Sequence, residues 1–121
     1  MARIERFEDI SGWQRARELV GLIYRLTSKP RFTKDWGLKE QIQRAAVSVM
    51  ANIAEGFERH SDREFVQFLY NARGSSGEVR SLLYVACDLG YITEVEFKEA
   101  FGKAEETSRA IFGLIRYLNP S

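Results

Sequence analysis

The segment Ala45–Gly56, AAVSVMANIAEG, decides the fold of this chain, together with the phenylalanine that follows it. Large apolar residues recur here at helical spacing: Val47, Val49, Ile53 and Phe57. Ser48, Asn52 and Glu55 follow one another at intervals of four and three, so they lie along one side of the same helix. A small and polar side next to an apolar side predicts a helix that packs closely against two different partners.

Apolar residues recur with helical period through almost the whole chain, and no stretch alternates convincingly in the way of a strand. Capping boxes at Ser61–Glu64 and Thr93–Glu96 predict two helix starts. The expected helices cover about residues 9–27, 37–57, 62–89 and 94–118, with a loop over residues 28–36. The prediction is an all-α fold, an antiparallel up-down-up-down four-helix bundle that forms a single domain over residues 1–121.

The expected third helix contains the sequence GSSG at residues 74–77, although two glycines inside a helix cost about 2 kcal/mol relative to alanine. The apolar period continues in phase on both sides, so we expect the helix to continue and a bulky neighbour to cross closely there. Close helix packing is therefore predicted at Gly56, Gly74 and Gly77. Small or apolar residues occupy more than one face of the second and third helices, which predicts a homo-oligomer.

The composition argues against several classes of function. The chain has 121 residues, a net charge of +1, one cysteine and one histidine, so neither a disulfide nor a zinc site within one chain is expected. It has no Glu-x-x-His motif, no phosphate-binding glycine loop with lysine and no plausible nucleophile–base pair. We expect no catalytic residue, metal or cofactor, and hence no enzyme. Charges interrupt every apolar run and the N-terminal segment, which predicts a cytoplasmic protein without membrane association.

The two parts of the chain differ in charge. Residues 1–44 hold ten Lys/Arg against six Asp/Glu, whereas residues 45–121 hold eight against eleven. This asymmetry fits an anionic partner at one face, or complementary charge between neighbouring helices or subunits. The second interpretation is favoured.

Residues 28–36, SKPRFTKDW, interleave basic and aromatic side chains. Cations that meet phosphates and rings that stack on bases suit RNA or single-stranded nucleic acid. The favoured alternative is that Phe32 and Trp36 close one end of the bundle while the lysines are solvated. Because helix direction alternates, the candidate nucleic-acid contacts fall at opposite ends of the bundle. One group comprises Lys29, Arg31, Lys34 and Lys39, and the other comprises Arg3, Arg6, Arg59 and Arg63.

A second constellation is polar. It joins the second helix to the third and consists of Asn52, Glu55, Asn71, Ser75 and Glu78, with Arg44 or Arg80 as partners for the carboxylates. Antiparallel packing would bring these residues together near mid-bundle. The favoured role is a hydrogen-bonded cluster that fixes helix register or a subunit interface, and the alternative is a pocket for a small ligand.

Three groups of segments together carry a resemblance to a known family. They are Phe7–Asp9 with Trp13–Ala16, Gln41–Phe57, and Glu64–Leu69 with Gly74-Ser75, Glu78 and Leu89–Tyr91. In these segments the chain resembles the small four-helix-bundle proteins encoded in intervening sequences of bacterial 23S ribosomal RNA genes. That family includes the accessory variability proteins of diversity-generating retroelements. The resemblance implies a ring-shaped homopentamer and, for the retroelement members, a nucleic-acid-binding partner of a reverse transcriptase.

Two functions of different class follow from these observations. The first is a non-enzymatic, oligomeric nucleic-acid-binding adaptor that binds RNA or DNA and serves as an accessory protein of a reverse transcriptase. The second is a protein-interaction scaffold without nucleic-acid binding. A continuous basic surface favours the first function, and mixed charge with an exposed apolar groove favours the second.

Overall fold

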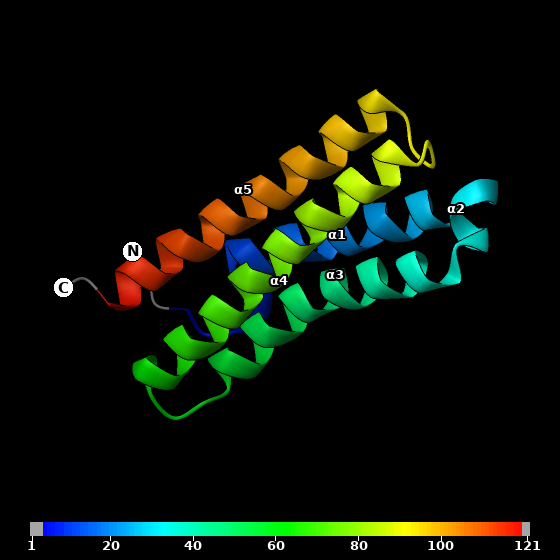
Figure 1. Ribbon diagram of the computed structural model, residues 1–121. Coiled ribbons are helices and arrows are strands. Elements are labelled where there is room, and N and C mark those ends of the chain that lie inside the picture. Colours follow the sequence, from blue (N-terminus) through cyan, green and yellow to red (C-terminus); the bar gives the residue numbers. More distant parts are fainter. Residues whose placement is uncertain (1–3, 120–121) are drawn as a thin grey trace.

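The computed structural model describes residues 4–119 and is helical almost throughout (Figure 1). Four long helices dominate, which confirms the predicted all-α four-helix bundle. Their bounds are α1 Ser11–Thr27, α3 Trp36–Phe57, α4 Asp62–Asp88 and α5 Glu94–Leu118. Two short elements complete the chain, the 3-10 turn η1 Phe7–Asp9 and the helix α2 Pro30–Lys34. The expected bounds of the long helices differ from these by at most two residues.

Each long helix packs against two others. Helix α1 lies against α3 and α5, and α4 also lies against α3 and α5. In Figure 1 the α3–α4 turn and both termini lie at one end of the bundle. The α4–α5 turn and α2 lie at the other end. Because the links between them are short, successive long helices run antiparallel.

The predicted capping box at Thr93–Glu96 is complete, whereas at Ser61–Glu64 only the side-chain cap forms and no bond from the Ser61 N–H to the Glu64 carboxylate is recorded. Ser61 Oγ accepts from the backbone N–H of Glu64 at 3.2 Å. At the start of α5, Thr93 Oγ1 accepts from the Glu96 N–H at 3.1 Å, and Glu96 Oε1 accepts from the Thr93 N–H at 2.9 Å. These reciprocal bonds satisfy backbone donors that a helix start leaves without partners.

The decisive segment forms the second half of α3 and supplies the core. Ile42, Ala46, Val49 and Ile53 are fully buried. At the end of this stripe Gly56 meets α4 directly, because an added Cβ would lie 2.6 Å from Phe68 Cβ and 3.0 Å from Phe65 Cδ1. The α3–α4 turn is therefore tight because this position carries no side chain.

Gly74 and Gly77, the two other glycines of the predicted close packing, behave differently. Helix α4 continues through residues 74–77, as expected, and its two serines there contact both neighbouring helices: Ser75 Oγ lies 3.0 Å from Ser48 Oγ of α3, and the buried Ser76 donates to the Ala104 carbonyl of α5 at 2.9 Å. An added Cβ at Gly74 would have no atom within 4 Å, and one at Gly77 would meet only Arg80 Nη2, at 3.6 Å. The close packing predicted for this segment is therefore made by Ser75 and Ser76, while Gly74 is exposed on the solvent side of α4 and neither glycine is crowded within the subunit.

The segment expected as a loop over residues 28–36 contains the short helix α2. Pro30 is its first residue, where the fixed φ favours a helix and no N–H is needed. Phe32 is fully buried and lies 5.4 Å from Tyr91 between ring centroids. Trp36 remains 73% exposed. The expected aromatic plug of the bundle end is therefore formed by Phe32, while Trp36 faces solvent.

Candidate nucleic-acid interface

The cations near α2 are largely engaged within the chain. Lys29 Nζ lies 2.5 Å from Glu96 Oε1 on α5. Arg31 donates to the carbonyls of Leu89 and Gly90, at 3.2 and 3.3 Å. These contacts fasten α2 to the α4–α5 turn. They give the basic residues of this end a structural role.

The electrostatics of this end support that role. The hydrogen bond from Lys29 holds the pKa of the Glu96 carboxyl below its ordinary value. The Tyr91 hydroxyl donates to Asp35 Oδ2 at 2.9 Å, and this bond raises the pKa of Tyr91. Lys39 donates to Thr33 Oγ1 at 3.1 Å. Of the four candidate contacts here, Lys34 alone has no recorded polar contact within residues 4–119.

The second predicted basic group does not form a continuous surface either. Arg59 pairs with Glu55 at 3.1 Å, and its guanidinium lies 4.6 Å from the Phe68 ring centroid. Arg6 pairs with Glu8, also at 3.1 Å. Arg63 is exposed and lines a shallow hollow near the end of α5, and Arg3 lies outside the described residues.

The predicted polar constellation is brought together only in part. Ser48 Oγ lies 3.0 Å from Ser75 Oγ, and Asn52 Nδ2 donates to the Ser48 carbonyl and hydroxyl at 2.9 and 3.0 Å. This small cluster joins α3 to α4 and fits a register contact. The remaining members are exposed: Glu55, Asn71 and Glu78. Arg44 pairs with Glu40 on its own helix, so the expected pairing with these carboxylates is absent.

A basic groove that the sequence reasoning missed runs between α4 and α5. Its arginines are Arg73 and Arg80 on α4, and Arg109 and Arg116 on α5. Within each helix the two are seven residues apart, which places them on one face about 10.5 Å apart along the axis. The groove has a volume of about 440 Å³, and Glu105 is the one carboxylate that lines it. We call this feature the arginine groove.

These arginines are not neutralised within the described part of the chain. No ion pair is recorded for any of the four there, whereas six other pairs form on its surface. The Nε of Arg80 is buried and has no hydrogen-bond partner. A buried donor without a partner costs about 1–3 kcal/mol of stability.

Aromatic rings hold the guanidinium groups in place. Arg73 lies over the Phe112 ring at 4.4 Å and Arg80 over the Phe101 ring at 5.9 Å, both measured to the ring centroid. Such contacts orient a cation without neutralising its charge. The arginine groove therefore combines fixed positive charge with aromatic surface.

Two glycines lie close to the arginines of the groove. Gly77 lies four residues after Arg73 and three before Arg80, on the same face of α4. An added Cβ at Gly77 would lie 3.6 Å from Arg80 Nη2, an ordinary contact distance. On α5, Gly113 lines the groove, and an added Cβ there would meet nothing within 4 Å.

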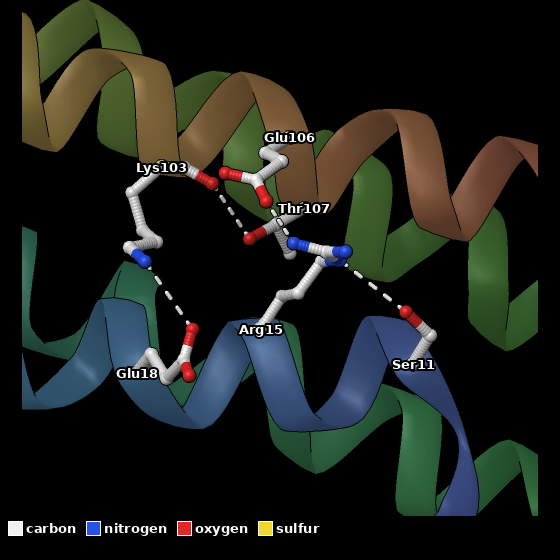
Figure 2. A network of polar contacts seen from close by, with 6 residues as sticks. All are labelled: Ser11, Arg15, Glu18, Lys103, Glu106 and Thr107. Atoms are coloured by element: carbon white, nitrogen blue, oxygen red, sulfur yellow. Dashed lines mark hydrogen bonds and ion pairs between the residues drawn. The ribbon is translucent and has the colours of Figure 1, made fainter.

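The α1–α5 surface shows the opposite arrangement (Figure 2). Arg15 pairs there with Glu106, and Lys103 pairs with Glu18 at 3.2 Å. Thr107 Oγ1 donates to the Lys103 carbonyl at 2.8 Å, a bond within α5 that lies beside the two ion pairs. Each cation has a carboxylate partner, so this network ties α1 to α5 and leaves little free charge for a ligand.

Sequence reasoning missed the arginine groove because it weighed charge along the chain. Residues 45–121 carry more carboxylates than cations, which directed attention to residues 1–44. The available signal was the repeated interval of seven, Arg73 to Arg80 and Arg109 to Arg116, on helices expected to be neighbours.

Within residues 4–119 no three His, Cys, Asp or Glu side chains gather in a way that could hold a metal ion. None of the helices described there is long and apolar enough to cross a membrane.

Comparison with known proteins places the chain in a family. The family described as 23S rRNA-intervening sequence protein matches residues 8–113. The chain belongs to this family. The match confirms the resemblance drawn from the sequence, and it includes all groove arginines except Arg116. No curated protein matches the chain.

One solved structure similar to this intervening-sequence protein is that of a protein of unknown function from the S23 ribosomal protein family of Bacteroides thetaiotaomicron VPI-5482. The two chains share 21% identity, with a TM-score of 0.80. The similarity covers 87% of this chain and 98% of the other. At this identity the comparison establishes the shared fold.

Proposed function

We propose that this intervening-sequence protein is a non-enzymatic adaptor that binds nucleic acid through the arginine groove. The observation that carries the proposal is the set of four arginines facing one carboxylate, with no recorded ion pair among the described residues. A guanidinium matches phosphate oxygens through paired N–H donors and keeps its charge at any physiological pH. An anionic polymer is the ligand that satisfies several such groups at once.

Self-association is a further part of the proposal. The outward side of α3 and α4 carries small or apolar exposed residues, including Val47, Ala51 and Gly74. Gly74 has open space where the sequence predicted a close crossing, and a second copy of the chain would supply that crossing. A homopentamer would repeat the arginine groove five times, so that weak individual contacts bind together through effective concentration.

Light scattering tests this part of the proposal. The Gly74→Leu variant should have a lower mass in solution than the wild type while its helical circular dichroism stays unchanged. A variant of unchanged mass would remove Gly74 from the subunit contact. The role of a reverse-transcriptase accessory protein, in the cytoplasm, rests on the family resemblance and is tested by co-purification with such an enzyme.

The protein-interaction scaffold remains the second candidate, and a specific observation favours it. Trp36 and Val95 are 73% and 78% exposed, and both lie at the end of the bundle where α3 and α5 begin. Large side chains exposed to this degree are typical of contact sites when they gather in a patch. A Trp36→Ala/Val95→Ala double variant that retains nucleic-acid binding would separate the two functions.

The main experiment compares two double variants of equal net charge by fluorescence anisotropy with labelled RNA and DNA. Arg73→Gln/Arg109→Gln removes half of the groove charge. Arg17→Gln/Arg25→Gln removes two exposed cations of α1. Four phosphate contacts on a single strand predict a slope of log K against log salt of about −2.8 per groove. The groove variant should lose about half of that slope.

The α1 variant should retain both the affinity and the slope of the wild type. Equal losses in the two variants would show that net charge, and not the groove, determines binding. A wild type that binds neither RNA nor DNA at low salt would refute the proposed function.

A further inference from the structure

The arginine groove leads into a half-exposed aromatic cluster. Tyr84 follows Arg80 by four residues, so it continues the line of arginines along α4. Its ring centroid lies 5.0 Å from that of Phe97 and 5.5 Å from that of Phe101. Phe101 also lies beneath the Arg80 guanidinium. Cation and ring surfaces therefore form one continuous strip across the α4–α5 face.

Tyr84 is held firmly yet remains open to solvent. Two phenylalanines on α5 contact its ring at interplanar angles of 53° and 73°, while 53% of the residue is exposed. No hydrogen bond of its hydroxyl is recorded among residues 4–119. A ring that two neighbours hold and that is more than half exposed offers a pre-ordered aromatic surface.

This arrangement distinguishes single strands from duplexes. In a duplex the bases stack on one another, and a protein reaches only their edges and the backbone. In a single strand the base faces are free, and each stacks on an aromatic side chain while cations meet the phosphates. The strip offers both contacts side by side, with the guanidinium groups at one end and an open ring at the other.

We propose that the arginine groove binds single-stranded nucleic acid, with phosphates on the arginines and one base stacked on Tyr84. This inference rests on the proposed function and specifies its substrate class.

The test uses a labelled oligonucleotide, alone and annealed to its complement, with three variants of the full chain. Tyr84→Leu removes the ring and keeps apolar contact with Phe97. Tyr84→Phe keeps the ring and removes the hydroxyl. Tyr24→Leu is the control, since Tyr24 is a 46% exposed tyrosine on α1. Circular dichroism melts establish that each variant is folded.

The wild type should bind the single strand more tightly than the duplex. Tyr84→Leu should weaken single-strand binding about 5- to 150-fold, the range for loss of one base–ring stack, and leave duplex binding unchanged. Tyr84→Phe and Tyr24→Leu should bind as the wild type does. A 2-aminopurine base in the strand should lose fluorescence on binding to the wild type but not to Tyr84→Leu.

Two results would overturn the inference. The first is equal affinity of the wild type for duplex and single strand, and the second is binding by Tyr84→Leu that equals that of the wild type. If Arg73→Gln/Arg109→Gln still weakens binding, the proposed function stands in either case. Absence of binding to either form of nucleic acid would overturn the inference and the proposed function together.

Discussion

Replacement of Gly56 by alanine should destabilise the bundle, although the same change normally stabilises a helix. Gly56 is buried in the last turn of α3, where the α3–α4 turn brings Phe65 and Phe68 against it. The added Cβ would lie 2.6 Å from Phe68 Cβ and 3.3 Å from the Phe65 carbonyl oxygen. Neither atom can rotate away, so the two helix ends must move apart.

The size of the effect follows from two opposing contributions. Overpacking of a tight contact costs about 1–3 kcal/mol, and a clash with atoms close to the backbone belongs in the upper part of that range. Replacing glycine by alanine inside a helix contributes about 1 kcal/mol of stability. The net expectation for Gly56→Ala is a loss of about 1–2 kcal/mol, or about 4–8 °C in Tm for a domain of this size.

Gly102→Ala, in α5, is the matched control. It makes the same substitution inside a helix, but the added Cβ meets nothing within 4 Å. This variant should gain about 0.5–1 kcal/mol and rise in Tm. Comparing the two variants cancels the helix-propensity contribution and isolates the cost of the close approach, about 2–3 kcal/mol.

The assay is urea unfolding followed by circular dichroism at one protein concentration, because self-association would make stability depend on concentration. Both variants should retain the m-value of the wild type. A Gly56→Ala variant that is at least as stable as Gly102→Ala would refute the reasoning, since it would show that α3 and α4 do not meet closely at Gly56.

Three further predictions concern the end of the bundle that α2 covers. Phe32→Ala should cost about 3–5 kcal/mol in urea unfolding, because the ring is fully buried, whereas Trp36→Ala at a 73% exposed position should change stability by less than about 0.5 kcal/mol. Equal effects would mean that Phe32 does not close this end. Thr93→Ala should cost about 1 kcal/mol through loss of the α5 capping box, and a melting curve that matches the wild type would contradict that role. The pKa of Glu96 is lowered in the folded state by its bond from Lys29, so its stabilising contribution is complete above the unfolded pKa and is lost as pH falls through the folded pKa. Urea midpoints measured from about pH 6 to pH 3 should therefore fall less in Glu96→Gln than in the wild type, and parallel curves would refute the coupling.

The candidate site illustrates how far local sequence reasoning reaches. The sequence shows basic residues near α2. In the structure, Lys29 and Arg31 bond to Glu96 and to the Leu89 and Gly90 carbonyls, and these contacts hold α2 against the α4–α5 turn. Charge counts along the chain cannot reveal such pairing, because the partners lie about 60 residues away. Conversely, Arg73 and Arg109 lie in the more acidic part of the chain and become neighbours of one groove only when α4 packs against α5.

The sequence by itself determined the four helices, their limits and their antiparallel order, because apolar period, capping residues and short turns act over a few residues. It also determined that α4 continues through residues 74–77, since the apolar stripe keeps its phase across the glycines. The tertiary structure decided which glycine is crowded and which cations remain without carboxylate partners. Both properties depend on the atoms that a neighbouring helix places within a few ångströms, and no local pattern specifies those atoms.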